Sequence, residues 1–274
     1  MTFQNVSSPV GALDFGIKST VDLQSLHLIG NNNPTPFDHS GKENGAWIIT
    51  NDCNLSIREN LVVSNNLGHG IVITHGANIS VGNSVIIQNN TRRGLSLVGL
   101  GGSNTFSLKA SSIDISYNQW GGLATSEPVA VLISAPTVRF AGNTALWHTE
   151  YDGNRGGALS LTLGRYSFDP PGTFTIAATE ILFVNNSAPN YGGAISIQGD
   201  LANFGHWTFE KLLFANNSAL LGGAIWSKQE SAYVDWFSNP NVSFVGNHAA
   251  LGCVISSTAL KDAPSSSYTS GLPD

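Results

Sequence analysis

Phe183-Val184-Asn185-Asn186, followed by Gly192-Gly193-Ala194-Ile195, is the stretch that decides how this chain folds. The same two tetrapeptides alternate four times in the second half of the chain. The Phe-x-x-Asn copies begin at residues 140, 183, 214 and 244, and the other glycine-led copies are 156–159, 222–225 and an altered 252–255. A pattern that returns every few tens of residues is typical of stacked structural units.

Weaker copies extend the pattern toward the N-terminus, with Leu, Val or Ile in place of Phe. They are Leu28…Asn31, Val63…Asn66, Ile87…Asn90 and Ile115…Asn118. Apolar residues alternate with other residues before each Asn, as in Val138/Phe140 and Ile181/Phe183, which predicts a strand with one apolar face. Only stacked strands can bury such a face. We therefore expect an all-β fold, a right-handed parallel β-helix of about 8–9 coils with the Phe residues stacked along its axis.

The motif residues are expected to build the coil itself. Each Asn is expected to close a turn and bond the Asn one coil away, and Asn tolerates the left-handed backbone of tight corners. The glycines mark a second corner, where positive φ or close backbone approach excludes a Cβ. In weaker copies such as Gly70-Ile71 the apolar residue follows the glycine directly, so a corner one residue shorter is an open alternative. The predicted structural residues are Phe140, Asn143, Phe183, Asn186, Phe214, Asn217, Phe244, Asn247, Gly157, Gly193 and Gly223.

Composition excludes several classes of protein. The chain has 274 residues, of which only 11% are charged, with a net charge of −6 and no basic run longer than Arg92-Arg93. A nucleic-acid surface needs a basic stripe, so nucleic acid is not expected as a partner. No stretch has the length of an apolar membrane span. The two cysteines, Cys53 and Cys253, would lie many coils apart and are expected to be free. No metal or other cofactor is predicted.

The domain organisation is expected to be simple. Residues 1–257 are expected to form one β-helix domain, with clean repeats in 138–255 and degenerate repeats in 1–137. Residues 258–274 read as a polar tail or linker. Because the N-terminus lacks the pattern of an export signal, we expect a segment of a longer chain.

The paired motifs resemble the repeat of the chlamydial polymorphic membrane proteins, clearly over residues 138–255 and weakly over 26–123. The resemblance implies an autotransporter passenger: a β-helical, adhesin-like segment on the bacterial outer membrane surface or secreted, with a role in virulence. It also implies a partner on a host or neighbouring cell, either a protein or a glycan, and leaves open homo-oligomers or stacking with adjacent repeats.

Loops 144–156, 164–174 and 226–240 are the expected recognition elements of such a scaffold. Their aromatic rings suit a sugar or a protein partner, although packing of the loops against the coil wall is an equal alternative. Leu182 and Leu213 should point outward and either hold a loop or form an apolar patch. The candidate binding residues are Trp147, His148, Glu150, Tyr151, Asp152, Trp226, Tyr233 and Trp236.

An enzymatic alternative starts from Gly68-His69-Gly70, which resembles a motif of β-helical polygalacturonases, as Asp52-Cys53 does. Those enzymes need a pair of aspartates to activate water, and here the pair is Asn51-Asp52. We interpret His69 as a surface corner residue. A secreted polysaccharide-degrading enzyme of the pectate lyase or polygalacturonase kind would require three or more acidic residues within about 6 Å, with a basic partner.

Overall fold

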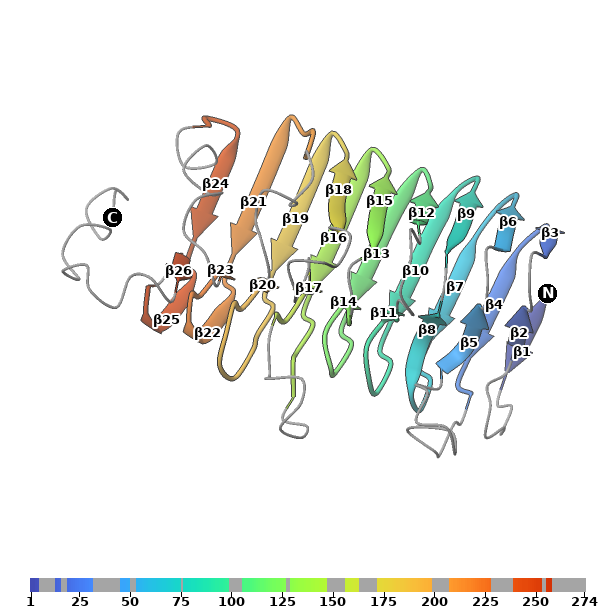
Figure 1. The fold of residues 1–274 in the computed structure, drawn as a ribbon, viewed down its shortest axis with the longest axis horizontal. Helices are drawn as coiled ribbons and strands as arrows, with labels where there is room; N and C mark the ends of the chain where they lie inside the picture. Colours follow the sequence, from blue (N-terminus) through green and yellow to red (C-terminus); the bar gives the residue numbers. More distant parts are fainter. Residues whose placement is uncertain are drawn as a thin grey trace.

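The computed structural model describes residues 1–4, 13–15, 19–31, 45–49, 53–74, 76–98, 105–126, 129–146, 156–162, 172–198, 207–227, 239–252 and 255–257. Every regular element in these ranges is a β-strand, and Figure 1 shows the strands stacked side by side along one long axis. All strand pairs are parallel, and each strand pairs with its counterpart one coil away. The predicted all-β parallel β-helix is therefore confirmed.

Three sheets form the faces of the coil. Sheet 1 contains the strands that precede each Asn: β1 (Thr2–Gln4), β4 (Leu26–Ile29), β7 (Leu61–Ser64), β10 (Ser84–Gln88), β13 (Ser112–Ser116), β16 (Thr137–Ala141), β19 (Glu180–Val184), β21 (Lys211–Ala215) and β24 (Val242–Val245). Sheet 2 contains the strands that follow the glycines: β2 (Leu13–Phe15), β5 (Gly45–Ile49), β8 (His69–Ile73), β11 (Leu95–Leu97), β14 (Leu123–Thr125), β17 (Leu159–Thr162), β20 (Ile195–Gln198), β23 (Ile225–Ser227) and β26 (Ile255–Ser257).

Sheet 3 closes the coil with β3 (Thr20–Leu23), β6 (Cys53–Ile57), β9 (Ala77–Val81), β12 (Thr105–Lys109), β15 (Ala130–Ser134) and β18 (Thr173–Ala177). A short fourth sheet pairs β22 (Ser218–Leu221) with β25 (His248–Leu251) near the C-terminal end. Nine strands in each of sheets 1 and 2 agree with the predicted number of coils.

The core is a continuous apolar column inside the coil. Phe140, Phe183 and Phe214 have no exposed surface, and Phe244, in the last coil, is half-buried. Their rings stack nearly parallel, with centroid separations of 5.2 Å, 4.9 Å and 4.9 Å along the series. These separations match the spacing of neighbouring strands, about 4.8 Å, because each ring extends from the same position of successive coils. Cys53 is buried and free, and Cys253 lies outside the described residues.

The predicted Asn ladder is present and buried. Nδ2 of each ladder residue donates to Oδ1 of the next, and the seven links measure 2.8 to 3.1 Å from Asn31 to Asn247. The left-handed backbone occurs one position earlier than the ladder residue, at Asn185 (φ 56°), Asn216 (φ 54°) and Gly142 (φ 63°). The turn thus divides two tasks between neighbours: one residue makes the sharp bend, and the next forms the ladder.

Positive φ and close backbone approach, the two reasons expected for the glycine pairs, both apply: the first holds for the first glycine and the second for the second glycine. Gly192 has φ 60°, in the left-handed region. A Cβ on Gly193 would lie 2.1 Å from the Gly223 carbonyl oxygen of the next coil. The first glycine is therefore needed for its conformation, and the second for close approach between coils.

The degenerate corners are shorter by more than one residue. Ile71, Leu95, Leu123 and Leu159 pair in register along sheet 2. Four residues separate Asn66 from Ile71, whereas seven separate Asn217 from Ile225. The additional residues after Asn217 contain β22, so the clean copies have an extra edge that the degenerate copies lack.

Candidate functional site

Most of the predicted binding residues lie outside the described residues. These are Trp147, His148, Glu150, Tyr151, Asp152, Tyr233 and Trp236. The same is true of the polar tail 258–274. Their roles remain predictions.

Trp226 does not form an exposed platform. It lies on β23, its side chain is only 4% exposed, and its ring centroid is 4.5 Å from that of Tyr191, tilted by 43°. Packing of the ring against the coil, the other alternative for this residue, is what the structure shows. Strand alternation places Trp226 on the outer face of sheet 2, because its neighbour Ile225 belongs to the core.

His69 is buried, and our interpretation of it as a surface corner residue is wrong. Its side chain is 1% exposed, and its ring meets Trp120 edge to face at a centroid distance of 5.9 Å. The Arg92 guanidinium lies 4.6 Å from the centroid of the same Trp120 ring. His69, Arg92 and Trp120 therefore form one packed cluster from three successive coils. Because the corner is short in this coil, His69 occupies the position in sheet 2 that is equivalent to Gly157 in the clean copies.

The enzymatic alternative requires acidic side chains that converge on one site. Within those ranges, no group of three or more His, Cys, Asp or Glu side chains is placed to hold a metal ion. Asp52, the acidic residue next to Cys53, is not among the described residues.

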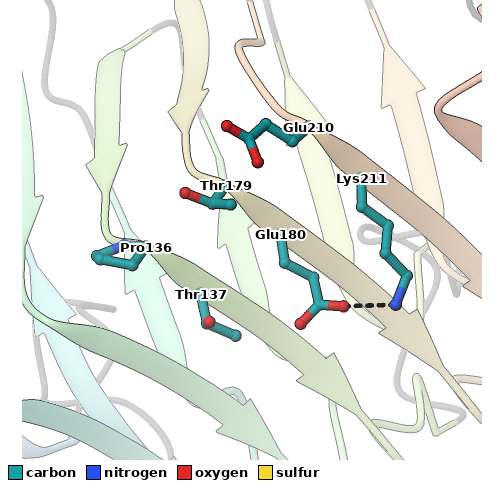
Figure 2. Close-up of a pocket in the computed structure, with 6 residues that line it drawn as sticks. All are labelled: Pro136, Thr137, Thr179, Glu180, Glu210 and Lys211. Carbon is teal, nitrogen blue, oxygen red and sulfur yellow. Dashed lines mark hydrogen bonds and ion pairs between the residues drawn. The ribbon is translucent and has the colours of Figure 1, made fainter.

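A shallow groove lies at the corner between sheets 3 and 1, where β16, β19 and β21 begin (Figure 2). Its volume is about 490 Å³. The corner is held by backbone bonds: the Pro136 carbonyl accepts from Thr179 and Glu180, and the Thr179 carbonyl accepts from Glu210 and Lys211. The lining residues are Pro136, Thr137, Thr179, Glu180, Glu210 and Lys211.

The charges in the groove are partly neutralised. Lys211 Nζ donates to Glu180 Oε1 at 2.5 Å, and the exposed Glu210 lies beside this pair. Two carboxylates, one ammonium and two threonine hydroxyls offer hydrogen bonds to a polar ligand. Glu210 and Lys211 are exposed and Glu180 is half-buried, so the groove is part of the surface of the scaffold.

The outer face of sheet 1 is a broad surface formed by nine strands. One residue per strand forms a row along it, paired in register: Thr2, His27, Val62, Ile86, Asp114, Arg139, Leu182, Leu213 and Ser243. All are half-buried except Thr2 and Ser243 at the two ends, which are exposed. Leu182 and Leu213 point outward as predicted, since Ile181, Phe183 and Phe214 belong to the core.

An ion pair interrupts the apolar part of this row. Arg139 Nη1 donates to Asp114 Oδ2 at 2.8 Å, and the two side chains are 35% and 34% exposed. The pair was not predicted from the sequence. The available signal was position: both residues lie one place before a core residue, Phe140 and Ile115, and therefore point outward.

A second ion pair perturbs a carboxylate near sheet 3. The hydrogen bond from Arg58 lowers the pKa of Asp22, with a smaller contribution from the Arg58 charge, and the same contact raises the pKa of Arg58. Hydrogen bonds from Gln24 and then Ser25 lower the pKa of Glu59. All three groups are at the surface, so these shifts report local pairing rather than a site of reaction.

Comparison with known families gives one match. Residues 180–198 and 211–228 match the Chlamydia polymorphic membrane protein repeat, which confirms the predicted resemblance over these residues. No curated protein sequence and no solved structure matches the chain. In the described ranges, no helix is long and apolar enough to cross a membrane.

Proposed function

We propose that the chain is a non-enzymatic passenger segment on the outer surface of the cell. This chain contains a match to the Chlamydia polymorphic membrane protein repeat. In this proposal the β-helix is a scaffold, and its loops bind a protein or glycan on a host or neighbouring cell. The repeat match carries the location, broadly at the outer membrane surface or outside the cell. The adhesive role is our own step beyond it.

One observation favours a scaffold that presents loops. Strands β16, β19 and β21 stay in register although the lengths of their connections differ widely. The connection from Asn143 to Leu159 holds 15 residues, whereas that from Asn66 to Ile71 holds four. A hydrogen-bonded stack tolerates such insertions because loop length changes the free energy of closure only slowly.

The insertions contain all of the candidate binding residues except Trp226, which lies on β23. Residues 147–155 come between the ladder turn of Asn143 and Gly156, and residues 228–238 come between β23 and β24. The Trp147 and Tyr151 rings of the first insertion have the chemistry that recognition surfaces favour. We therefore place recognition in loop 144–156 first.

The test is binding of the purified chain to cultured host cells and to a glycan array. Trp147→Ala should weaken attachment at least about tenfold while leaving the unfolding midpoint unchanged. Tyr117→Ala is the matched control, because Tyr117 is an aromatic residue 55% exposed on another turn. Unchanged attachment of the Trp147 variant would remove this loop from the proposal, and attachment by neither the native chain nor its variants would refute adhesion. A polysaccharide-cleavage assay run beside it would detect the enzymatic alternative.

A further inference from the structure

In the outward row of sheet 1, the eight residues from His27 to Ser243 have chemically matched partners at equal distances from the centre of that stretch. Asp114 and Arg139 stand at its centre, on β13 and β16. Ile86 and Leu182 flank them, and Val62 and Leu213 come next. His27 and Ser243 come next, and Thr2 of β1 extends the row beyond His27 by one residue that has no counterpart at the other end. Each apolar residue thus has an apolar counterpart at the same distance from the centre, and each charge has an opposite charge.

We propose that this face binds a second copy of the chain, face to face, about a two-fold axis that lies in the interface between β13 and β16 and runs along the strands. Such an axis reverses the order of the coils and keeps the strand direction. Asp114 then lies opposite Arg139 of the second copy, Ile86 opposite Leu182, and Val62 opposite Leu213. A two-fold interface must be self-complementary in this way, since residue i meets residue j twice.

The flanking positions of the same strands obey the same symmetry. Two residues before the central row, Ser112 lies opposite Thr137 and Ser84 opposite Glu180, which are hydrogen-bonding combinations. In the next pair Asn60 lies opposite Lys211, so no two like charges of the described strands meet. Like charges placed face to face would cost several kilocalories per mole, and their absence over a whole face favours this arrangement.

Two residues after the central row, the proposed interface offers little at its centre. Ser116 and Ala141 are almost fully buried within one copy, so they make no contact across the axis, and Gln88 lies opposite Val184. Val184 and the 57% exposed Val245 lie toward one end, and Val245 falls opposite Ile29.

The available area suits a modest dimer. Eight strands spaced about 4.8 Å apart span about 34 Å, and five residues of each strand span about 16 Å. Two such faces bury on the order of 1,100 Å² in total, at the lower limit for a specific interface. Sheets packed face to face lie about 10 Å apart with strand directions within about 30° of each other, which is near the strand alignment that this axis requires. We therefore expect micromolar association.

The charge pair supplies the first test. Sedimentation of the full chain at about 100 µM should show a dimer, which micromolar association saturates. Arg139→Asp places four acidic groups together at the axis and should weaken dimerisation at least about 100-fold. The double variant with Asp114→Arg and Arg139→Asp restores both the pair within each copy and the contacts across the axis, so it should restore the dimer. Arg58→Asp is the control, since it breaks an ion pair outside this face.

The apolar positions test the register directly. Leu182→Lys and Ile86→Glu should each weaken the homodimer. Mixed together, the two variants should form a heterodimer, because one lysine then faces one glutamate while the native Ile86–Leu182 contact remains on the other side. This mixing experiment decides the matter even if Arg139→Asp fails to fold.

Three results would overturn the proposal. The first is a native chain that sediments as a monomer at about 100 µM, a concentration at which an interface of this size should be occupied. The second is a dimer that survives Arg139→Asp and Leu182→Lys. The third is a mixture of Leu182→Lys and Ile86→Glu chains that stays unassociated while both variants are folded by circular dichroism.

Discussion

Asn186→Ala removes one interior member of the buried amide ladder, and the cost of the change can be worked out from individual contacts. The Asn186 side chain donates through Nδ2 to Asn217 Oδ1 and to the Phe140 carbonyl, both at 3.0 Å. Its Oδ1 accepts from the backbone N–H and from Nδ2 of Asn143, both at 3.1 Å. All four hydrogen bonds are fully buried or bounded by core residues.

Alanine leaves two donors of Asn143 without an acceptor: the backbone N–H and one side-chain N–H. A buried donor that loses its acceptor costs about 1–3 kcal/mol. Asn217 Oδ1, which loses the Asn186 amide, still accepts from the backbone N–H of residue 186. The two unpaired donors of Asn143 together give an expected loss of about 2–5 kcal/mol in the free energy of unfolding. The loss should be local, since coils in a solenoid contact only their neighbours.

Hydrogen exchange measured beside urea unfolding is the appropriate assay. In the variant, amides of Asn143 and of β16 and β19 should exchange faster, while those of β7, three or more coils away, keep their protection. Asn78→Ala is the matched control: its amide bonds Asn54 at 3.0 Å on the exposed outer face of sheet 3. That change should stay within about 0.5 kcal/mol. A loss below about 1 kcal/mol at Asn186 would refute the view that the ladder holds the coils together.

Three further outcomes are expected. Phe214→Ala should cost about 3–5 kcal/mol, because a fully buried ring leaves the axial stack; a loss of unfolding free energy below about 1 kcal/mol in urea titration would contradict this. Gly193→Ala should cost about 2 kcal/mol or more, since the new Cβ would meet a carbonyl of the next coil, and an unchanged thermal midpoint would argue against that contact. Arg58→Gln should raise the pKa of Asp22 toward its ordinary value in an NMR titration. In the native chain the pKa is depressed, so the stabilisation from Asp22 is present above its unfolded pKa and is lost as the pH falls through the folded pKa.

The parallel coil was predictable because its determinants are local and repeated. Alternation around Phe140, Phe183 and Phe214 sets which face is buried, and a single misplaced residue would turn that face to solvent. An Asn at a fixed distance after each aromatic residue could then be expected to bond its counterpart. The structure confirms both expectations, with stacked rings and a ladder linked at 2.8 to 3.1 Å.

His69 shows where local reasoning failed. Its neighbours Gly68 and Gly70 look like the glycines of a clean corner, which suggested an exposed position. Pairing of Ile71 with Leu95 shows instead that the corner is shorter and that His69 packs on Trp120 of a later coil. The deciding contact joins residues 51 positions apart, beyond the reach of any local spacing.

By itself, the sequence determined which residues face inward, where each coil bends and that coils stack, since these depend on side-chain alternation and on the conformational freedom of Asn and Gly. Only the tertiary structure decided how the outward residues line up. Asp114 and Arg139 are 25 positions apart, and the hydrogen-bonded register between β13 and β16 brings them into one ion pair at the centre of one row. Connections of variable length leave that register unspecified in the sequence, and the ladder of backbone bonds between coils sets it.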